Sequence, residues 1–356
     1  MKTRFIPLPG TPDGVKQMLD QRDKPLVVVS RHGLGDNVFF SPCFERLNEI
    51  FSRVGFCSCV NAYASIFHGS DQVEVLYSGA VNGADLGLSS ADGFARHFER
   101  IGLDVGAASA LVYHFGLFEP HLPYTDERAY VKGRRNFIEL FGTGPSAERV
   151  PRYHLAPDQA SKPFVEAVLA RWLPGRELIC IARYGHTDGA KNFGDDFHET
   201  LRLIELLNER YPERFKFITF DYSPGEHAAD GRAPNVRSIY GFLPCDASSM
   251  CHVLSKASIF VTVPSGPMLV GAALPGLRMV TLWKTMHPYH FLDPQFAAAP
   301  PVRALVGRGE LMDTSFMGGW PAASREAVLR RWRARLAPID SRTVFDEVSS
   351  IVEEST

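Results

Sequence analysis

The fold prediction starts from Leu26-Val-Val-Val-Ser-Arg-His-Gly-Leu-Gly-Asp-Asn37. Its first five residues form an apolar run rich in β-branched side chains, which is typical of a strand buried on both faces of a parallel sheet. The loop Arg31–Asn37 follows, and the next apolar pattern predicts a helix from about Ser41 to Arg53. A strand, a glycine-containing loop and a helix in this order predict one unit of an open α/β sheet, where ligands bind at the carboxyl ends of strands.

The same alternation of short β-branched runs and helical patterns continues along the chain. A first α/β domain, 1–150, contains further strands at 55–60, 73–77 and 110–115 and helices at 91–101 and 126–141. The stretch 142–162 is rich in Gly, Pro, Ser and charge and has no apolar face, so we place the interdomain linker there. A second α/β domain, 151–325, contains strands at 177–183, 215–220, 258–263 and 278–283 and helices at 163–172, 195–210, 246–256 and 266–274.

The C-terminal residues 326–356 are treated as a separate helical segment. Two helical patterns, at 324–336 and 341–353, cover this part of the sequence. Whether these helices pack back on the N-terminal domain is open at this point.

Composition and charge limit the classes of partner. The 356 residues carry a formal net charge of −2, so no overall field gathers nucleic acid or an anionic membrane. No apolar run is long enough for a transmembrane segment, and the N-terminal residues show no secretory leader, so we expect a cytoplasmic protein. The six cysteines include no CxxC pair, and Cys57 and Cys180 stand in apolar runs, which favours buried thiols over a metal site or a disulfide.

The first loop supplies a candidate carboxylate. Gly33 and Gly35 are expected to allow positive φ and a close approach of the backbone to a ligand. The third glycine of a dinucleotide fingerprint and the GK[ST] of a P-loop are both missing. Asp36 lies where a helix is expected to begin, so it is either an N-cap or a catalytic carboxylate, and these roles are compatible. Arg31 and His32 are further candidate donors in this loop, or ordinary exposed residues.

The second loop, Arg183–Gly194, follows a strand in the second domain. Arg183, Thr187 and Lys191 are donors suited to phosphate oxygens, and the helix after them adds a partial positive charge. The loop is therefore a candidate diphosphate site, with a solvated turn as the alternative. Glu226, after the strand at 215–220, is a candidate contact to a nucleotide ribose or a solvated turn carboxylate.

The third loop lies within Val261–Val270. A strand ends near Pro264, and a helix begins through Ser265, Gly266 and Pro267. Proline at an early helical position loses no hydrogen bond, and the backbone N–H groups around it are available to an anion. Ser265 is either a phosphate ligand or a simple N-cap. The three loops would converge on an interdomain cleft if each lies at the carboxyl end of its strand.

These motifs together resemble glycosyltransferase family 9, the bacterial heptosyltransferases. Gly33-Leu-Gly-Asp36, followed by Ser41-Pro42, carries the first part of the resemblance. Lys191-Asn-Phe-Gly-Asp-Asp-Phe-His-Glu-Thr-Leu201 is similar to the family's Lys-x-Trp-Pro-x-x-x-Trp-x-x-Leu. Val263-Pro-Ser-Gly-Pro-Met-Leu-Val-Gly-Ala-Ala-Leu274 is similar to its Asp-[Ser/Thr]-Gly-x-x-His-x-x-Ala-Ala-Leu. The resemblance implies the GT-B architecture, in which two Rossmann-like α/β domains face an interdomain cleft.

The resemblance also implies an activity. It indicates a metal-independent inverting glycosyltransferase that moves a hexose or heptose from a nucleotide diphosphate donor, with ADP-heptose favoured, and needs no cofactor. Asp36 would be the general base toward the acceptor hydroxyl, Lys191 would bind the diphosphate, and Ser265 with the Gly266 amide would hold phosphate oxygens. The acceptor could be a lipopolysaccharide-core sugar, a protein side chain or a small metabolite, bound mainly by the first domain.

Two positions depart from the family pattern. Pro264 stands where the family has Asp, and Leu269 stands where it has His. Either the donor has changed, or the chain is a catalytically inactive homologue that binds a sugar nucleotide or a carbohydrate. An epimerase or phosphorylase of the same two-domain shape would need a second acid or a phosphate pocket, which the sequence does not indicate.

Overall fold

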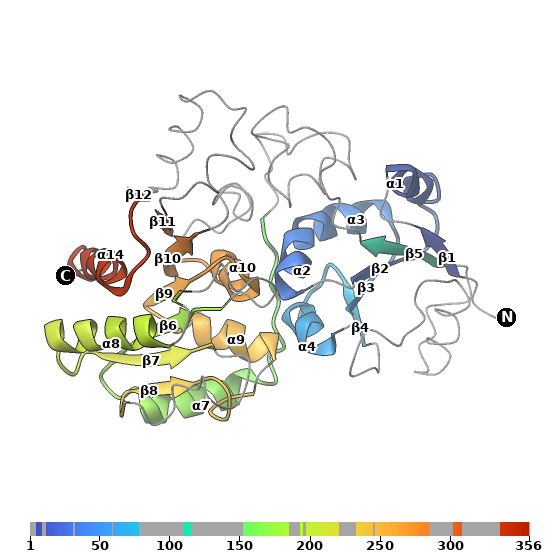
Figure 1. The fold of residues 1–356 in the computed structure, drawn as a ribbon. Coiled ribbons are helices and arrows are strands. Elements are labelled where there is room, and N and C mark those ends of the chain that lie inside the picture. The colour runs from blue at the N-terminus through green and yellow to red at the C-terminus, as the bar shows by residue number, and fades with distance from the viewer. Residues whose placement is uncertain are drawn as a thin grey trace. The chain divides into compact units, whose positions relative to one another are not determined.

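The protein is seen in a computed structural model as two compact units (Figure 1). The first unit is Met1–Gln159 with Asp246–Ser248, and the second is Ala160–Cys245 with Ser249–Thr356. The structure describes residues 5–8, 12–30, 33–58, 60–77, 110–115, 152–184, 193–194, 197–220, 233–244, 246–284, 302–307 and 335–355. The predicted helices at 91–101 and 126–141 lie outside the described residues.

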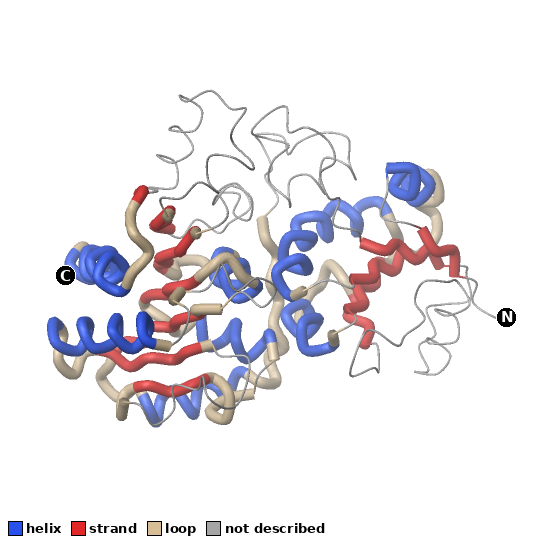
Figure 2. Tube along the Cα trace, viewed as in Figure 1, coloured by secondary structure: helices blue, strands red, loops and turns tan. Residues whose placement is uncertain are grey.

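The first unit contains a five-stranded parallel sheet with the order β1-β5-β2-β3-β4 (Figure 2). Its strands are β1 (Phe5–Leu8), β2 (Leu26–Ser30), β3 (Val54–Ser58), β4 (Glu74–Tyr77) and β5 (Ala110–Phe115). Its described helices are α1 (Pro12–Leu19), α2 (Leu34–Phe40), α3 (Phe44–Ile50) and α4 (Asn61–Ala64), with 3₁₀ turns η1 (Ser41–Cys43) and η2 (Ser65–Phe67). Strand β1 was not expected from the sequence, because it is short and contains Pro7. It pairs only with β5 among the described strands, and proline is tolerated at such an edge.

The helix after β2 begins earlier than the sequence suggested. It starts at Leu34 rather than near Ser41, and Leu34 and Val38 are buried in its first two turns. Pro42 lies in η1, where the helix tightens before α3 continues to Ile50. Proline lacks the N–H that a regular helix would use, which accounts for the irregular turn at this point.

Three phenylalanines form the aromatic centre of the first unit. Phe44, Phe56 and Phe67 are fully buried and come from α3, β3 and η2. Each pair of rings meets edge to face, with centroids 5.0 to 5.4 Å apart. This geometry is favourable for aromatic pairs, and it joins a strand to the elements on both sides of it in the sequence.

Residues 152–159, the later part of the predicted linker, pack on the first unit. The backbone N–H of His154 donates to Ser41 Oγ (2.8 Å), and that of Ala156 donates to Ile66 O (2.8 Å). Tyr153 is buried, with its ring edge-on to Phe39. Since these contacts tie the segment to α2 and η2 over several residues, it is a structural part of the unit.

The second unit contains a seven-stranded parallel sheet with the order β12-β11-β10-β9-β6-β7-β8. Its strands are β6 (Glu177–Ala182), β7 (Phe215–Thr219), β8 (Val236–Ser238), β9 (Ile259–Thr262), β10 (Arg278–Trp283), β11 (Val302–Val306) and β12 (Arg335–Leu336). The helices of this part of the chain are α7 (Lys162–Trp172), α8 (His198–Arg210), α9 (Ala247–Leu254), α10 (Gly266–Ala272) and α14 (Ser341–Glu353).

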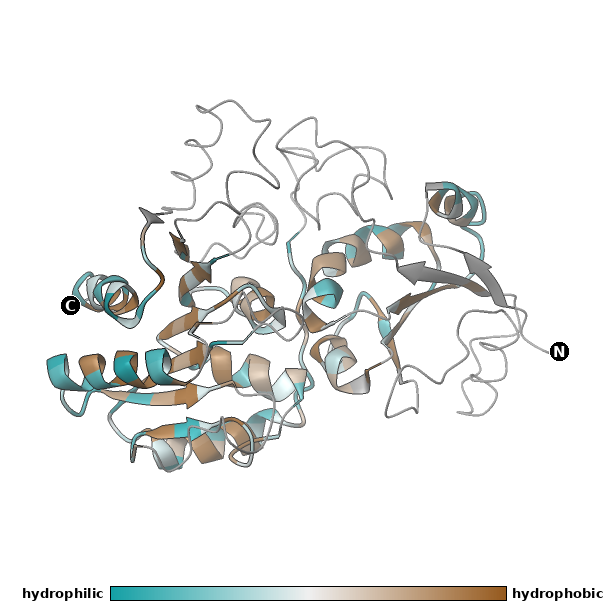
Figure 3. Cartoon of the chain, in the orientation of Figure 1, coloured by the Kyte–Doolittle hydropathy of each residue, from teal (hydrophilic) through white to brown (hydrophobic). Residues whose placement is uncertain are grey.

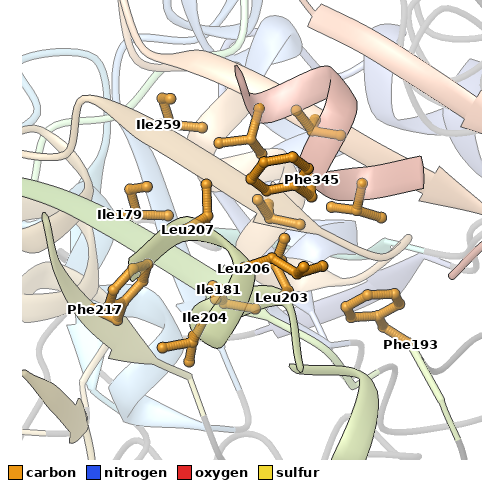
Figure 4. Packing of buried hydrophobic residues seen from close by; sticks show 14 of the residues in the cluster. Ile179, Ile181, Phe193, Leu203, Ile204, Leu206, Leu207, Phe217, Ile259 and Phe345 are labelled. Atoms are coloured by element: carbon orange, nitrogen blue, oxygen red, sulfur yellow. The ribbon is translucent and has the colours of Figure 1, made fainter. Parts of the chain in front are cut away.

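Helices α8 and α14 cover one face of this sheet. α8 alternates hydrophobic and hydrophilic bands (Figure 3), and its buried side includes Leu203 and Leu207. These leucines share a buried cluster with Phe345 of α14 and with Ile179 and Ile181 of β6 (Figure 4). α10 lies on the other face, because a Cβ on Gly271 would fall 2.8 Å from the ring of Phe260, which alternates with the cluster residues along β9.

The C-terminal segment is a helix only in part. The expected helix at 341–353 is confirmed as α14, while Arg335 and Leu336, the end of the other expected helix, form strand β12. The rest of that expected helix lies outside the described residues. α14 packs in the core of the second unit, in the same buried cluster as α8.

The described cysteines are buried, as expected from their apolar surroundings. Cys43, Cys57, Cys180 and Cys251 are free thiols with little or no exposure. Burial raises the pKa of Cys251 to about 12 and raises the pKa of Cys43 and Cys180 as well. Cys59 and Cys245 lie outside the described residues.

Truncation of the aromatic centre should destabilise the first unit strongly. Phe44→Ala removes a fully buried ring that packs edge to face with those of Phe40, Phe56 and Phe67. We therefore expect the free energy of unfolding to fall by about 3–5 kcal/mol in chemical denaturation. Phe164→Ala is the control, since that ring is 55% exposed and its loss should cost within about 0.5 kcal/mol. Equal effects of the two substitutions would contradict the assigned core.

The packed segment should also make stability depend on pH. Burial lowers the pKa of His154, whose Nε2 lies 2.9 Å from Ser70 Oγ, although Asp71 and Glu45 act in the opposite direction. The unfolded chain therefore binds this proton more readily, and His154 removes stability as the pH falls from about 6.5 through its lowered pKa. We expect His154→Gln to reduce the loss of stability between about pH 7.5 and pH 5, measured by denaturation at each pH. The exposed Phe164→Ala, which removes no titratable group, should leave the profile unchanged, and an identical profile for both variants would argue against this role of His154.

Candidate functional site

The order of the first sheet marks one place as a candidate site. The chain passes from β2 to β3 and β4 on one side, whereas β5 lies on the other side of β2. Connections that leave in opposite directions open a crevice at the carboxyl ends of the two strands, and open α/β sheets bind ligands there. The residues after β2 therefore stand at the expected position of a ligand in this unit.

Asp36 lies in the first turn of α2 at this edge. Gly33 is the N-cap, with an extended backbone, and the Asp36 backbone N–H donates to Gly33 O (3.1 Å). The interpretation of Asp36 as the N-cap is therefore wrong, because that position belongs to Gly33. The Asp36 side chain is half-exposed, as a carboxylate that exchanges a proton with a bound hydroxyl must be.

The two glycines have a different role from the one expected. Gly33 has φ −67°, and Gly35 lies inside α2, so the expectation of positive φ is wrong. A Cβ placed on Gly33 would lie 3.8 Å from Asp36 Oδ2. A side chain at position 33 would therefore contact the carboxylate, and glycine avoids that contact.

Asn37 ties this turn to the sheet through buried side chains. Its Oδ1 accepts a hydrogen bond from Ser30 Oγ, and its Nδ2 donates to Ser58 Oγ at 3.4 Å. Ser30 and Ser58 end β2 and β3 and are register partners, and all three side chains have no exposed surface. The network fixes the first turn of α2, and hence Asp36, over the ends of two strands. Sequence reasoning missed it, although a serine closing each apolar strand was a usable signal.

The second sheet has a reversal of the same kind between β6 and β9. The chain continues from β6 to β7 and β8 on one side, and from β9 to β10 on the other. Ala182 pairs with Thr262, and the Val263 N–H donates to Ala182 O at 3.1 Å. The loops after β6 and β9 therefore begin side by side, which brings Arg183 and Ser265 to the same edge of the sheet.

Arg183 provides a buried cation at this edge. Its side chain is 1% exposed, and its guanidinium carbon lies 3.8 Å from the ring centre of Tyr184 and 4.5 Å from that of Phe197. The loop returns to the strand at Phe193, whose N–H donates to Arg183 O at 2.9 Å. Cation–π contacts of this kind hold a charge in place away from water. Sequence reasoning identified Arg183 but missed the rings that hold it.

Ser265 occupies the N-cap position of α10, but its side chain does not cap the helix. The hydroxyl donates to Val263 O at 3.0 Å. Gly266 and Pro267 are the first residues of α10, as predicted, and Pro267 is buried. Leu269 is 1% exposed in the same helix, so this position packs into the core.

The remaining candidates lie outside the described residues. They are Arg31 and His32 of the first loop, Thr187 and Lys191 of the second, and Glu226. The described candidates fall into two groups, one in each unit. Asp36 lies with Gly33 and Gly35, while Arg183 lies at one sheet edge with Ser265, Gly266 and Pro267.

Comparison with known proteins identifies the fold. No family model matches the sequence, and no curated protein is similar to it in sequence. Solved structures do match. A glycosyltransferase of family 9 from Veillonella parvula is 13% identical with a TM-score of 0.57, over 94% of this chain and 99% of its own. The ADP-heptose lipopolysaccharide heptosyltransferase II of E. coli is 13% identical with a TM-score of 0.58, over 93% of this chain and 100% of its own.

The chain has the fold of the family 9 glycosyltransferases. A third match is the dodecameric iron-containing heptosyltransferase TibC of E. coli, in complex with ADP-D-β-D-heptose, at 14% identity and a TM-score of 0.55. It covers 94% of this chain and 78% of TibC. The prediction of an α/β protein with two parallel sheets is confirmed by the family 9 fold.

Two kinds of feature are absent from the part of the chain that the structure describes. None of the described helices combines the length and the apolar character that a membrane span requires. In the same residues, no group of His, Cys, Asp and Glu side chains is arranged to hold a metal ion.

Disruption of the buried amide should destabilise the first unit. Asn37→Leu removes two buried hydrogen bonds, one to Ser30 Oγ and one to Ser58 Oγ, and removing one partner of a buried polar pair costs about 1–3 kcal/mol. We expect a loss of that size in chemical denaturation. Asn48→Leu, on the exposed side of α3, is the matched control and should change the free energy of unfolding by within about 0.5 kcal/mol. A neutral result for Asn37→Leu would show that the network does not hold α2.

Proposed function

We propose that the chain is a metal-independent inverting glycosyltransferase that transfers a sugar from a nucleoside diphosphate to an acceptor hydroxyl. The observation that carries the proposal is the position of a half-exposed carboxylate, Asp36, at the direction reversal of a sheet in a family 9 fold. A second reversal, in the other sheet, carries the candidate donor residues.

Asp36 is proposed as the general base. Displacement at a sugar carbon requires the acceptor hydroxyl to lose its proton as the new bond forms, and a positioned carboxylate can take that proton. The first turn of a helix favours negative charge, and Asn37 holds the turn without adding a charge of its own. The residues around Asp36 in the first unit would then bind the acceptor, with Arg31 and His32 as further donors.

The second unit is proposed to bind the donor. The leaving diphosphate gains negative charge as the sugar departs, so donors at its oxygens lower the barrier. Lys191 and Thr187 are proposed as direct ligands, with the Ser265 hydroxyl, the Gly266 amide and the start of α10 at Pro267.

The donor set extends beyond these direct ligands. Ser265 would have to turn its hydroxyl away from Val263 O in order to donate to phosphate. Arg183 adds a fixed positive charge behind this edge, and Glu226 is proposed to contact the ribose.

The finer assignments follow the resemblance. An ADP-linked heptose or related hexose is the proposed donor, supported by the TibC complex with ADP-D-β-D-heptose. A lipopolysaccharide-core sugar, a protein side chain or a small metabolite is the proposed acceptor, and the cytoplasm is the proposed compartment.

Two substitutions should separate donor binding from catalysis. We expect the chain to bind ADP more tightly than UDP or GDP in calorimetry, and Lys191→Ala to abolish that binding. Asp36→Asn should keep ADP affinity within about twofold and reduce release of ADP from ADP-heptose, with acceptor sugars present, by about 10²–10⁴-fold. If Lys191→Ala leaves ADP affinity unchanged, the proposed donor site is wrong. If Asp36→Asn retains full turnover, Asp36 is not the general base.

One observation favours a second candidate, a catalytically inactive homologue that binds a sugar nucleotide or carbohydrate. Pro264 and Leu269 are both buried apolar residues at positions where the resemblance predicts polar ones. This candidate predicts ADP binding that depends on Lys191, together with no release of ADP from any nucleotide sugar in the unaltered chain.

A further inference from the structure

The start of α8 is the structural base of the proposed donor loop. The loop begins at Arg183, directly after β6. The next described residue is Phe193, and α8 begins at His198. Phe197, directly before the helix, lies over the Arg183 guanidinium. The first turn of α8 therefore contributes to holding the buried cation at the start of the loop.

A second helix holds this turn from the far end of the sequence. The Ser341 N–H, at the start of α14, donates to Glu199 Oε2 at 2.6 Å. At the other end of the pair, Glu353 of α14 lies 3.5 Å from Arg210 and 3.4 Å from the Tyr211 hydroxyl. The N-terminal ends of the two helices are in contact with each other, and so are their C-terminal ends. α8 and α14 therefore run parallel, with their buried sides in one cluster.

Parallel helices place two partial positive charges together at their N-termini. Glu199 sits in the first turn of α8, and its carboxylate accepts from the first N–H of α14, so one negative charge serves both helix ends. Asp340 caps α14 by accepting from the Thr343 N–H at 2.8 Å. The amide of Ser341 would otherwise be one of the donors that a helix start leaves without a partner.

We infer that Glu199 is a positioning residue for nucleotide binding: through Ser341 it fixes the first turn of α8, and thereby the Arg183–Phe197 stack, against the C-terminal helix. The inference rests on the proposed function, because it assigns nucleotide binding to this edge of the second sheet. It adds that α14, more than 140 positions further along the chain, is required for the shape of the donor site. Glu199 itself touches neither nucleotide nor sugar.

The test compares the two ends of the same helix pair in the full-length chain. Glu199→Ala removes the tie at the start of α8, and Glu353→Ala removes the tie at its end. Both should lower the thermal unfolding midpoint, which is what a purely structural role predicts. ADP affinity, measured by calorimetry well below both midpoints, should fall about fivefold or more in Glu199→Ala and stay within about twofold in Glu353→Ala. Glu199→Gln keeps an oxygen that can accept a hydrogen bond from the Ser341 N–H, so its ADP affinity should lie between those of the alanine variant and the unaltered chain. If Glu199→Ala does not fold, Glu199→Gln still tests the inference.

The outcomes separate this inference from the proposed function. If the unaltered chain binds ADP and Glu199→Ala and Glu199→Gln bind it equally well, the positioning role is wrong and the donor site stands. If Glu353→Ala weakens ADP binding as much as Glu199→Ala, the effect comes from helix docking in general and the inference is also wrong. If the unaltered chain binds none of ADP, UDP and GDP, the proposed function and this inference are both overturned.

Discussion

Both candidate sites depend on strand pairing between segments that are distant in sequence. β6 pairs with β9 and β2 pairs with β5, and each pairing reverses the direction in which the sheet grows. If β9 did not lie against β6, Arg183 and Ser265 would not share an edge. The hydrogen bond from the Val263 N–H to Ala182 O shows how directly the ladder sets the spacing of the two loops.

β2 and β10 were predictable because burial on both faces leaves a continuous apolar run, and both have the predicted bounds. β5 and α14 also have the predicted bounds, and the buried residues of α14 recur at helical spacing. β11 was missed although it lies inside the sheet, because Arg303 interrupts its apolar run. The edge strands β1, β8 and β12 were missed as well. They have four, three and two residues, too few for a pattern to emerge, and only the partner strand makes them visible.

The sequence predicted which loops carry polar candidate residues, but it did not predict the contacts that hold those loops in place. Asp36 and Ser265 follow apolar strands, so their place at a sheet edge could be inferred from local pattern alone. The partners of Asn37 and Glu199 could not, because Ser58 lies 21 positions away and Ser341 lies 142 positions away. The prediction of positive φ at Gly33 was also wrong. Glycine is common both at extended N-caps and in tight turns with positive φ, so the local pattern does not distinguish the two.

The two edges are held by different physical means, and the difference suits different chemistry. A neutral amide and two hydroxyls fix the turn of Asp36, so this network holds the turn without a charge of its own. A network built on a cation would stabilise the ionised carboxylate and make it a poorer proton acceptor. The other edge is built around the buried guanidinium of Arg183, which packs against two aromatic rings. The proposed general base would gain from the first arrangement, and the proposed diphosphate site from the second.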